Sequence, residues 1–234
     1  MKFPIDKLNP SSKGEEIAGL MRFEIISGHL KPGDIVSENS IAKKYNSSRS
    51  PSREALRILQ NERLLSLNRT GVEIIGLSQK DIEELSDIRY LIENFAIKEC
   101  TKKNDDELIA FLNFTVEKMK IAINKEDPTE LAFQDIAFHE AIIKASNHDQ
   151  IHHWWKNIEK LIVTALLIAT EKRFSTETKT DFKEFLVESH LNIVDVIRDG
   201  RIDEVEEILQ THFIDTRATV RKSVFINNEF KKGH

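Results

Sequence analysis

The sequence predicts a mainly α-helical protein of two domains. Gly and Pro, the residues that most often interrupt helices, number only eight and five in 234 residues. Apolar residues recur at helical spacing along most of the chain. An alternation typical of strands is confined to one short stretch, residues 65–75. We therefore predict a small N-terminal domain over residues 1–76 and an all-helical antiparallel bundle over residues 77–234.

The two predicted domains differ in charge. Residues 1–76 contain 12 Lys and Arg against 9 Asp and Glu, whereas residues 77–234 contain 22 against 30. Within residues 43–69 there are seven basic side chains and two acidic ones. A basic segment in an acidic chain indicates a polyanionic partner for the N-terminal domain alone.

The only cysteine, Cys100, excludes an internal disulfide framework and a cysteine metal cluster. The N-terminus lacks the apolar run of a signal peptide, and the most apolar stretch, residues 161–169, is too short to span a bilayer. We therefore expect a cytoplasmic protein with no membrane partner.

The first helix is predicted over residues 13–27, because apolar residues form a stripe and Gly28 supplies a left-handed end. Pro32 and Gly33 suit the two central positions of a type II turn. Ser37 can then cap a second, shorter helix that ends near Tyr45.

A third helix follows the polar connection at residues 46–48. We predict Ser50 as its N-cap and Pro51 as its first residue. One face of this helix is apolar, and the opposite face carries Arg49, Arg53 and Arg57 at four-residue intervals. Such a face can be an ordinary solvated surface, but at a helix N-terminus it also suits phosphates and guanine edges.

Residues 65–75 alternate around a basic tip at Arg69, which predicts a two-stranded hairpin. Two short helices joined by a tight turn, followed by a hairpin, make a winged helix-turn-helix. Its second helix would enter a DNA groove with the hairpin beside it.

These residues resemble the winged-helix domain of the GntR family of bacterial transcription regulators. The shared pattern is Gly28-His-Leu-Lys-Pro-Gly33, then Ser48-Arg-Ser-Pro-Ser-Arg-Glu-Ala-Leu56, then a Gly in the wing. The resemblance implies a homodimer that binds a near-palindromic operator in double-stranded DNA. The positions that it implies as DNA contacts are Ser48, Arg49, Ser50, Arg53, Thr70 and Gly71. Asn39 stands where some relatives place an Arg that touches the operator.

The C-terminal domain has no convincing strand pattern. Capping residues and polar breaks predict six helices, over residues 79–102, 105–125, 129–147, 149–171, 180–198 and 201–226. Short connections between helices of this length favour an antiparallel bundle.

Four polar side chains lie on apolar stripes of these helices: Asp135, His139, His190 and His212. A single histidine in this position is usually a core residue bonded to a neighbour. Three histidines and a carboxylate that all point inward are harder to accommodate, because buried polar groups need partners. His190 precedes Gly200 by ten residues and His212 follows it by twelve, so in a helical hairpin they lie at similar depths, about 15 and 18 Å from the turn. This donor set favours Zn²⁺, Ni²⁺ or Mn²⁺.

The same four residues resemble the metal ligands of the FCD domain, the ligand-binding domain of the FadR-type GntR subfamily. Members with this set hold a divalent metal that helps to bind a small organic acid. The resemblance also implies that Arg89 and Glu93 lie near the effector pocket, where Arg89 could bind a carboxylate. The alternative for these two residues is an ordinary surface pair at i, i+4 spacing.

The favoured hypothesis is a transcription repressor, not an enzyme, that responds to a carboxylate effector bound at the metal. One alternative is a regulator for which the metal ion itself is the signal. Another is a metal-dependent enzyme, which would leave the arginine-bearing helix unexplained.

Overall fold

The computed structural model describes residues 3–69, 71–103, 105–176 and 181–225. The chain divides into two compact units, one containing the residues up to Asp81 and the other spanning Ile82–Ser223. Among the described helices, none combines the length and the apolar character that a membrane crossing requires.

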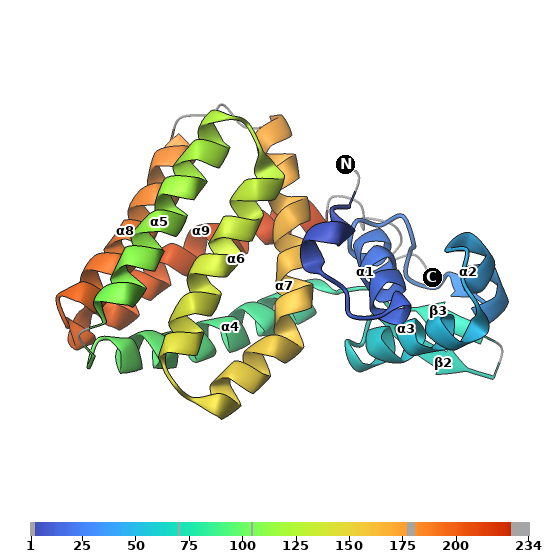
Figure 1. Ribbon diagram of the computed structural model, residues 1–234. Helices are drawn as coiled ribbons and strands as arrows, with labels where there is room; N and C mark the ends of the chain where they lie inside the picture. The colour runs from blue at the N-terminus through green and yellow to red at the C-terminus, as the bar shows by residue number, and fades with distance from the viewer. Residues whose placement is uncertain (1–2, 70, 104, 177–180, 226–234) are drawn as a thin grey trace. The chain divides into compact units, whose positions relative to one another are not determined.

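The described part of the N-terminal unit combines helices with a small sheet (Figure 1). The helices are α1 (Lys13–Ile26), α2 (Glu38–Lys44) and α3 (Arg49–Asn61), preceded by the short 3₁₀ helix η1 (Ile5–Leu8). The strands are β1 (Ile35–Val36), β2 (Leu65–Asn68) and β3 (Gly71–Ile74), which form an antiparallel sheet in the order β1-β3-β2. The predicted helices and hairpin are all present.

Local signals explain most of these elements. Gly28 follows α1 with φ of 79°, as a left-handed helix end requires. Gly33 has φ of 89°, and Asp34 N–H donates to the Lys31 carbonyl at 3.0 Å, which makes the predicted type II turn. Ser37 caps α2 through the backbone N–H of Ser40.

The predicted start of α3 is wrong by two residues. Ser48, not Ser50, is the N-cap, and its side chain makes no capping hydrogen bond. The Ser48 carbonyl instead accepts the first helical bond, from Ser52 N–H, and also the Ser52 hydroxyl at 3.0 Å. Pro51 is therefore the third helical residue, a position whose N–H has no partner inside a helix.

Strand β1 was not predicted. Its two residues are too few to show an alternation, and they are extended because β3 offers a free edge for pairing. The core of this unit is formed mainly where α1 packs on α3, with Ile17, Met21, Leu56 and Leu59 almost completely buried. This packing fixes the direction of α3.

The second unit is helical throughout its described residues. Its helices are α4 (Gln79–Cys100, which begins just before the boundary), α5 (Asp106–Asn124), α6 (Pro128–Ala145), α7 (Asp149–Thr176), α8 (Asp181–Arg198) and α9 (Val205–Phe225), with the 3₁₀ turn η2 (Ile202–Glu204) before α9. Each predicted helix is present. Helix α7 continues five residues beyond its predicted end at residue 171.

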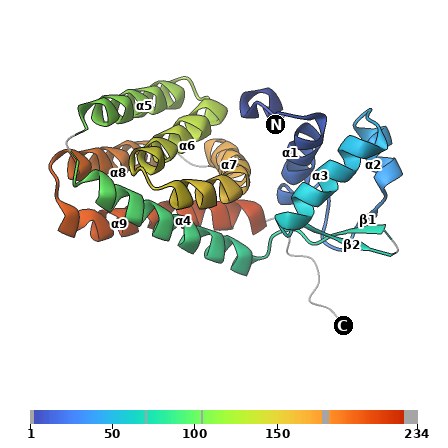
Figure 2. The same ribbon diagram turned by 60° about the horizontal axis from the view of Figure 1, so that its bottom comes forward.

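Helix α4 contacts two helices that are distant from it in the sequence, α6 and α9 (Figure 2). It runs antiparallel to α9, with Asp87 bonded to Arg217 and Lys98 near Glu206. It crosses α6 (Figure 1), where Arg89 faces Asp135 and Cys100 donates to the Ile142 carbonyl. The candidate metal ligands lie where these helices meet α8.

Candidate functional site

The three predicted histidine ligands meet in the interior of the helical unit. His139 comes from α6, His190 from α8 and His212 from α9, and all three are almost completely buried. Their ring centroids are 4.7–5.4 Å apart. Each offers a nitrogen within 4.8 Å of the others, a spacing at which one ion could be shared.

The fourth predicted ligand lies beside them. Asp135 Oδ1 is 3.2 Å from His190 Nε2, and Asp135 Oδ2 is 4.0 Å from His139 Nε2. Asp135 and His139 are one turn apart on α6, so the helix itself presents both side chains to the same side.

Hydrogen bonds at Nδ1 determine which ring nitrogen of His190 and of His212 carries the proton. His190 Nδ1 lies 2.7 Å from the Leu186 carbonyl, which can only accept, so Nδ1 is the donor. The Ser189 hydroxyl also donates to Leu186, at 3.0 Å, and its oxygen is then left to accept from His212 Nδ1 at 3.1 Å. In the neutral rings, Nε2 of both His190 and His212 therefore carries a lone pair.

The third ring is held by a carboxylate. Glu93 Oε2 lies 2.7 Å from His139 Nδ1, and the Arg89 guanidinium donates to Glu93 Oε1 at 2.6 Å. Arg89 also lies 3.7 Å from Asp135, and its side chain and that of Glu93 are only 5% and 2% exposed. The alternative of a surface Arg–Glu pair is therefore wrong: these two residues orient the candidate ligands from behind.

The environment favours the protonation states that a metal requires. Burial lowers the pKa of His212 well below its ordinary value, and the nearby His190 and His139 lower it further. Burial also lowers the pKa of His139, although Glu93 opposes this shift. Burial would raise the pKa of Asp135, but contact with His190 and the charges of His139 and Arg89 hold it well below its ordinary value. A lowered pKa favours the neutral imidazole of His139 and His212 and the ionised carboxylate of Asp135, which are the forms that bind a metal.

Several buried polar atoms at this site lack a hydrogen-bond partner within the part of the chain that the structure describes. At its centre they are Nε2 of the three histidines and Oδ2 of Asp135. Behind these lie Nη2 of Arg89 and the pair His139 Nδ1 and Glu93 Oε2, whose two atoms are 2.7 Å apart. Unsatisfied buried acceptors are rare because each costs about 1–3 kcal/mol. Here four of them converge on one place, so the residues present fit a divalent cation.

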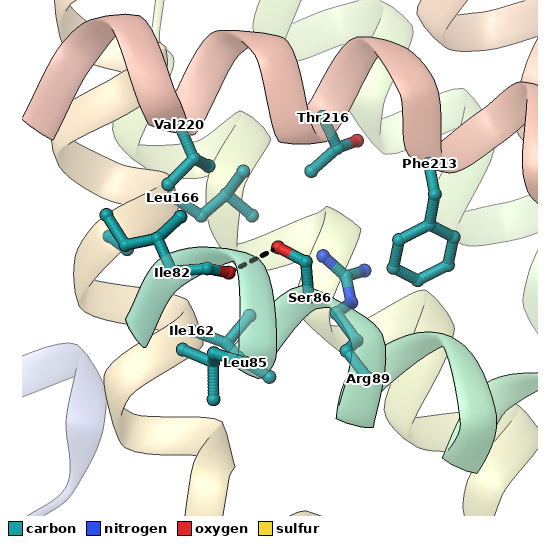
Figure 3. A pocket seen from close by; sticks show the side chains of 10 residues that line it. Ile82, Leu85, Ser86, Arg89, Ile162, Leu166, Phe213, Thr216 and Val220 are labelled. Atoms are coloured by element: carbon teal, nitrogen blue, oxygen red, sulfur yellow. Dashed lines mark hydrogen bonds between the residues drawn. The ribbon is translucent and has the colours of Figure 1, made fainter. Parts of the chain in front are cut away.

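A pocket adjoins this cluster (Figure 3). It lies between α4, α7 and α9 and has a cavity volume of about 30 Å³. Its wall is mostly apolar, with polar groups from Ser86, Arg89 and Thr216, and the Phe213 ring lies 5.0 Å from the Arg89 guanidinium carbon. Arg89 thus lines the pocket on one side and reaches Asp135 on the other. Glu93 lies deeper, between Arg89 and His139.

The structure exposes the predicted DNA-contact residues at the start of α3. Ser48, Arg49, Ser50 and Arg53 are all exposed, as is Arg57 one turn farther on. Arg53 is bonded to Glu38 of α2 through both oxygens of the carboxylate, at 3.2 and 3.1 Å. The basic face of the helix is therefore solvated rather than packed against other described residues.

At the predicted wing, Gly71 begins β3 and Thr70 lies outside the described residues. Gly71 has φ of 142°, and a Cβ there would approach the Val36 carbonyl oxygen to 3.1 Å. Glycine is thus required here for backbone reasons, whatever its role toward DNA. Arg69, at the end of the hairpin, is exposed.

Sequence reasoning missed the residues that orient the site. Ser189 follows no motif, and Ser86 and Thr216 appear in the sequence as ordinary helix residues. Ser189 meets His212 only through the packing of α8 against α9. Ser86 and Thr216 instead bond to carbonyls of their own helices, and the fold places them in the wall of the pocket. Their one sequence signal is a small polar residue on a helix face that also carries a candidate ligand.

Two family models match the chain. Residues 13–72 match the model described as "Bacterial regulatory proteins, gntR family", and residues 84–215 match the FCD domain model. Together they cover both units, and the FCD match alone covers more than half of the chain.

Curated relatives agree. The chain is 35% identical over 218 residues to the gluconate operon transcriptional repressor of Bacillus licheniformis, a match that covers 93% of this chain and 89% of that protein. It is 38% identical over 191 residues to the repressor of the same name from Bacillus subtilis strain 168, covering 82% of this chain and 78% of that one.

Solved structures support the fold. E. coli McbR/YncC matches with a TM-score of 0.69 at 20% identity, covering 90% of this chain and 98% of that one. A GntR regulator from Rhodococcus sp. RHA1 matches with a TM-score of 0.62 at 22% identity, covering 91% and 99%. The matched families and relatives are transcription regulators, which excludes the metal-dependent enzyme. The chain belongs to the GntR family of bacterial regulatory proteins and combines that family's DNA-binding domain with an FCD domain.

Proposed function

We propose that this protein is a cytoplasmic transcription repressor whose affinity for its operator is controlled by a small organic acid bound at a divalent metal ion. In this proposal residues 1–76 bind DNA and residues 77–234 bind metal and effector. The protein acts as a homodimer in this proposal, and its two-fold symmetry then calls for a near-palindromic operator in double-stranded DNA.

The proposed DNA contacts are Ser48, Arg49, Ser50 and Arg53 of α3, with Thr70 and Gly71 at the wing. The exposure of the α3 residues supports this role. Arginine side chains can bond phosphates or pair with the two acceptors of guanine, whereas the small serines allow the helix to approach closely.

The proposed metal ligands are Asp135, His139, His190 and His212, and the ion is Zn²⁺, Ni²⁺ or Mn²⁺. The observation that carries this proposal is the 3.2 Å contact between His190 Nε2 and Asp135 Oδ1. Because His190 Nδ1 donates to Leu186, the neutral ring presents a lone pair to a carboxylate. Two facing lone pairs repel, so this contact supports a cation shared by the two atoms, as a bound metal ion would be.

The proposed effector-binding residues are Arg89 and Glu93. Arg89 supplies a fixed positive charge at the pocket, and Glu93 holds Arg89 and His139 in place. When bound, the metal would supply a Lewis acid that attracts the carboxylate of the effector. Two relatives are named as repressors of a gluconate operon, so gluconate is the first acid to test.

The acid can shift the protein between DNA-binding and non-binding states only by its difference in affinity for them. The test is a titration of operator affinity with Zn²⁺-loaded and metal-free protein, each with and without gluconate and citrate. The operator is a duplex selected by the protein from a random-sequence pool. We expect an acid to change the affinity of the loaded protein alone, by about fivefold or more.

The second candidate is a regulator that senses the metal itself, and the buried histidine cluster favours it equally. In that case Zn²⁺ alone changes operator affinity and no acid adds to its effect. The same titration separates the two functions.

A further inference from the structure

The ion pair between Glu38 and Arg53 joins the two helices of the helix-turn-helix. Arg53 Nε donates to Glu38 Oε1 at 3.2 Å, and Arg53 Nη2 donates to Glu38 Oε2 at 3.1 Å. This parallel pair of bonds fixes the plane of the guanidinium as well as its position. It therefore determines the direction in which a proposed DNA-reading side chain points.

Folding stability does not account for this pair. The side chain of Arg53 is 54% exposed and that of Glu38 is 38% exposed. Ion pairs as exposed as this one contribute little to folding stability, because water screens the two charges. A carboxylate on a face that meets DNA phosphates also has a cost, since it repels them. The field of Arg49 and Arg57 reaches Glu38 as well, which places the carboxylate on the basic face of α3.

Glu38 is itself held firmly. It is the first residue of α2, directly after the cap at Ser37, where Ser37 and Ser40 exchange hydrogen bonds of 3.0 and 3.1 Å. The backbone of Glu38 is therefore fixed, and its shorter side chain holds the longer and more flexible side chain of Arg53 in place.

The pair also leaves Arg53 able to bind. Glu38 uses Nε–H and one N–H of Nη2, two of the five N–H groups of a guanidinium. The outer edge, formed by Nη1 and the second hydrogen of Nη2, has the spacing that matches the two acceptors of guanine or two phosphate oxygens.

We propose that Glu38 is a positioning residue for DNA recognition: it holds Arg53 by its inner edge and so directs the outer edge to one site on the operator. This inference rests on the proposed DNA contact of Arg53. Glu38 then raises specificity, because it favours the one base or phosphate that meets the oriented guanidinium and penalises other placements.

The test compares affinity for the selected operator with affinity for a scrambled duplex of the same length. We expect Glu38→Ala and Glu38→Gln to lower the ratio of the two affinities about five- to tenfold, the larger loss being that of Glu38→Ala, while binding to the scrambled duplex is unchanged or tighter. Glu16→Gln is the matched control, because Glu16 is a half-exposed carboxylate in the first turn of α1 paired with Lys13. It should leave the ratio unchanged.

A double-mutant cycle identifies the route of the effect. If Glu38 acts through Arg53, Glu38→Ala should change nothing further in an Arg53→Ala background. Equal tightening on both duplexes would show that Glu38 only competes with DNA, and an unchanged ratio would show that it has no role in recognition; either result overturns the inference. If Arg53→Ala itself leaves operator affinity unchanged, the proposed contact of Arg53 fails as well, so the two failures are distinguishable.

Discussion

His190 and His212 face each other across the turn at Gly200, with ring centroids 4.7 Å apart. Each is anchored by Nδ1, His190 to the Leu186 carbonyl and His212 to the Ser189 hydroxyl. Both Nε2 atoms therefore point into the same space. Four predictions test this metal site, the DNA-binding face of α3, and the buried residues Arg89 and Cys100.

Replacement of a histidine ligand should remove the metal. We expect His190→Ala to lower bound metal from about one ion per chain to near zero, because it removes one of the four proposed donors and the weakened site loses its ion during purification. Operator binding without effector should persist, since the DNA-binding residues belong to the other unit. Mass spectrometry of the metal content of purified protein measures this. His153→Ala removes an exposed histidine of α7 and should retain the ion.

Removal of the central arginine of α3 should weaken DNA binding. We expect Arg53→Ala to reduce operator affinity by about 1–3 kcal/mol, the range for one good arginine–base contact. If Arg53 instead contacts a phosphate, the slope of log affinity against log salt should fall by about one. A mobility-shift titration at several salt concentrations distinguishes these outcomes. Arg198→Ala, an exposed arginine of α8 paired with Asp195, should change neither quantity.

Arg89 should matter for stability as well as for the effector. Arg89→Met leaves the buried carboxylates of Glu93 and Asp135 without their cation, which we expect to lower the free energy of unfolding of metal-free protein by about 3–5 kcal/mol at pH 7. Arg89 lowers the pKa of both carboxylates against the effect of burial, from ordinary values of 4.5 and 3.8.

The pH dependence has a definite sign. A lowered folded-state pKa stabilises the protein above the ordinary value, and this stability is lost as the pH falls below it. The difference between wild type and Arg89→Met should therefore shrink between pH 5 and pH 3, as urea unfolding at each pH can measure. A difference that stayed constant with pH would mean that the two carboxylates are not what Arg89 stabilises.

Cys100 should be unreactive in the folded protein. Burial raises the pKa of its thiol to about 11, so the nucleophilic thiolate is scarce near pH 8. Alkylation by iodoacetamide at pH 8 should be slow in native protein and fast in urea. The raised pKa also means that the folded state keeps a proton that the unfolded state loses above about pH 9. Stability should then fall with pH by up to about 1.4 kcal/mol per pH unit, and Cys100→Ala should remove that part of the slope.

Much of this fold follows from short-range rules. The meeting of His190 and His212 could be predicted because a helix rises by a constant amount per residue and the turn at Gly200 reverses the chain. The turn at Pro32 and Gly33 could likewise be predicted, since these residues restrict or permit the backbone angles by themselves. The start of α3 was misplaced because several adjacent serines can cap a helix, and only the folded chain decides which carbonyl accepts the first bond.

By itself, the sequence determined the helices, the hairpin, the basic face of α3 and the four candidate ligands, because these depend on residue type and on spacing along one helix. Tertiary structure alone decided that two residues extend to form β1, that Ser189 orients His212 and that Glu38 holds Arg53. Those contacts join residues of different elements, and their distances depend on how the elements pack. Apart from a short helical hairpin such as the one at Gly200, sequence spacing carries no information about that packing, because the same helices can pack at many angles.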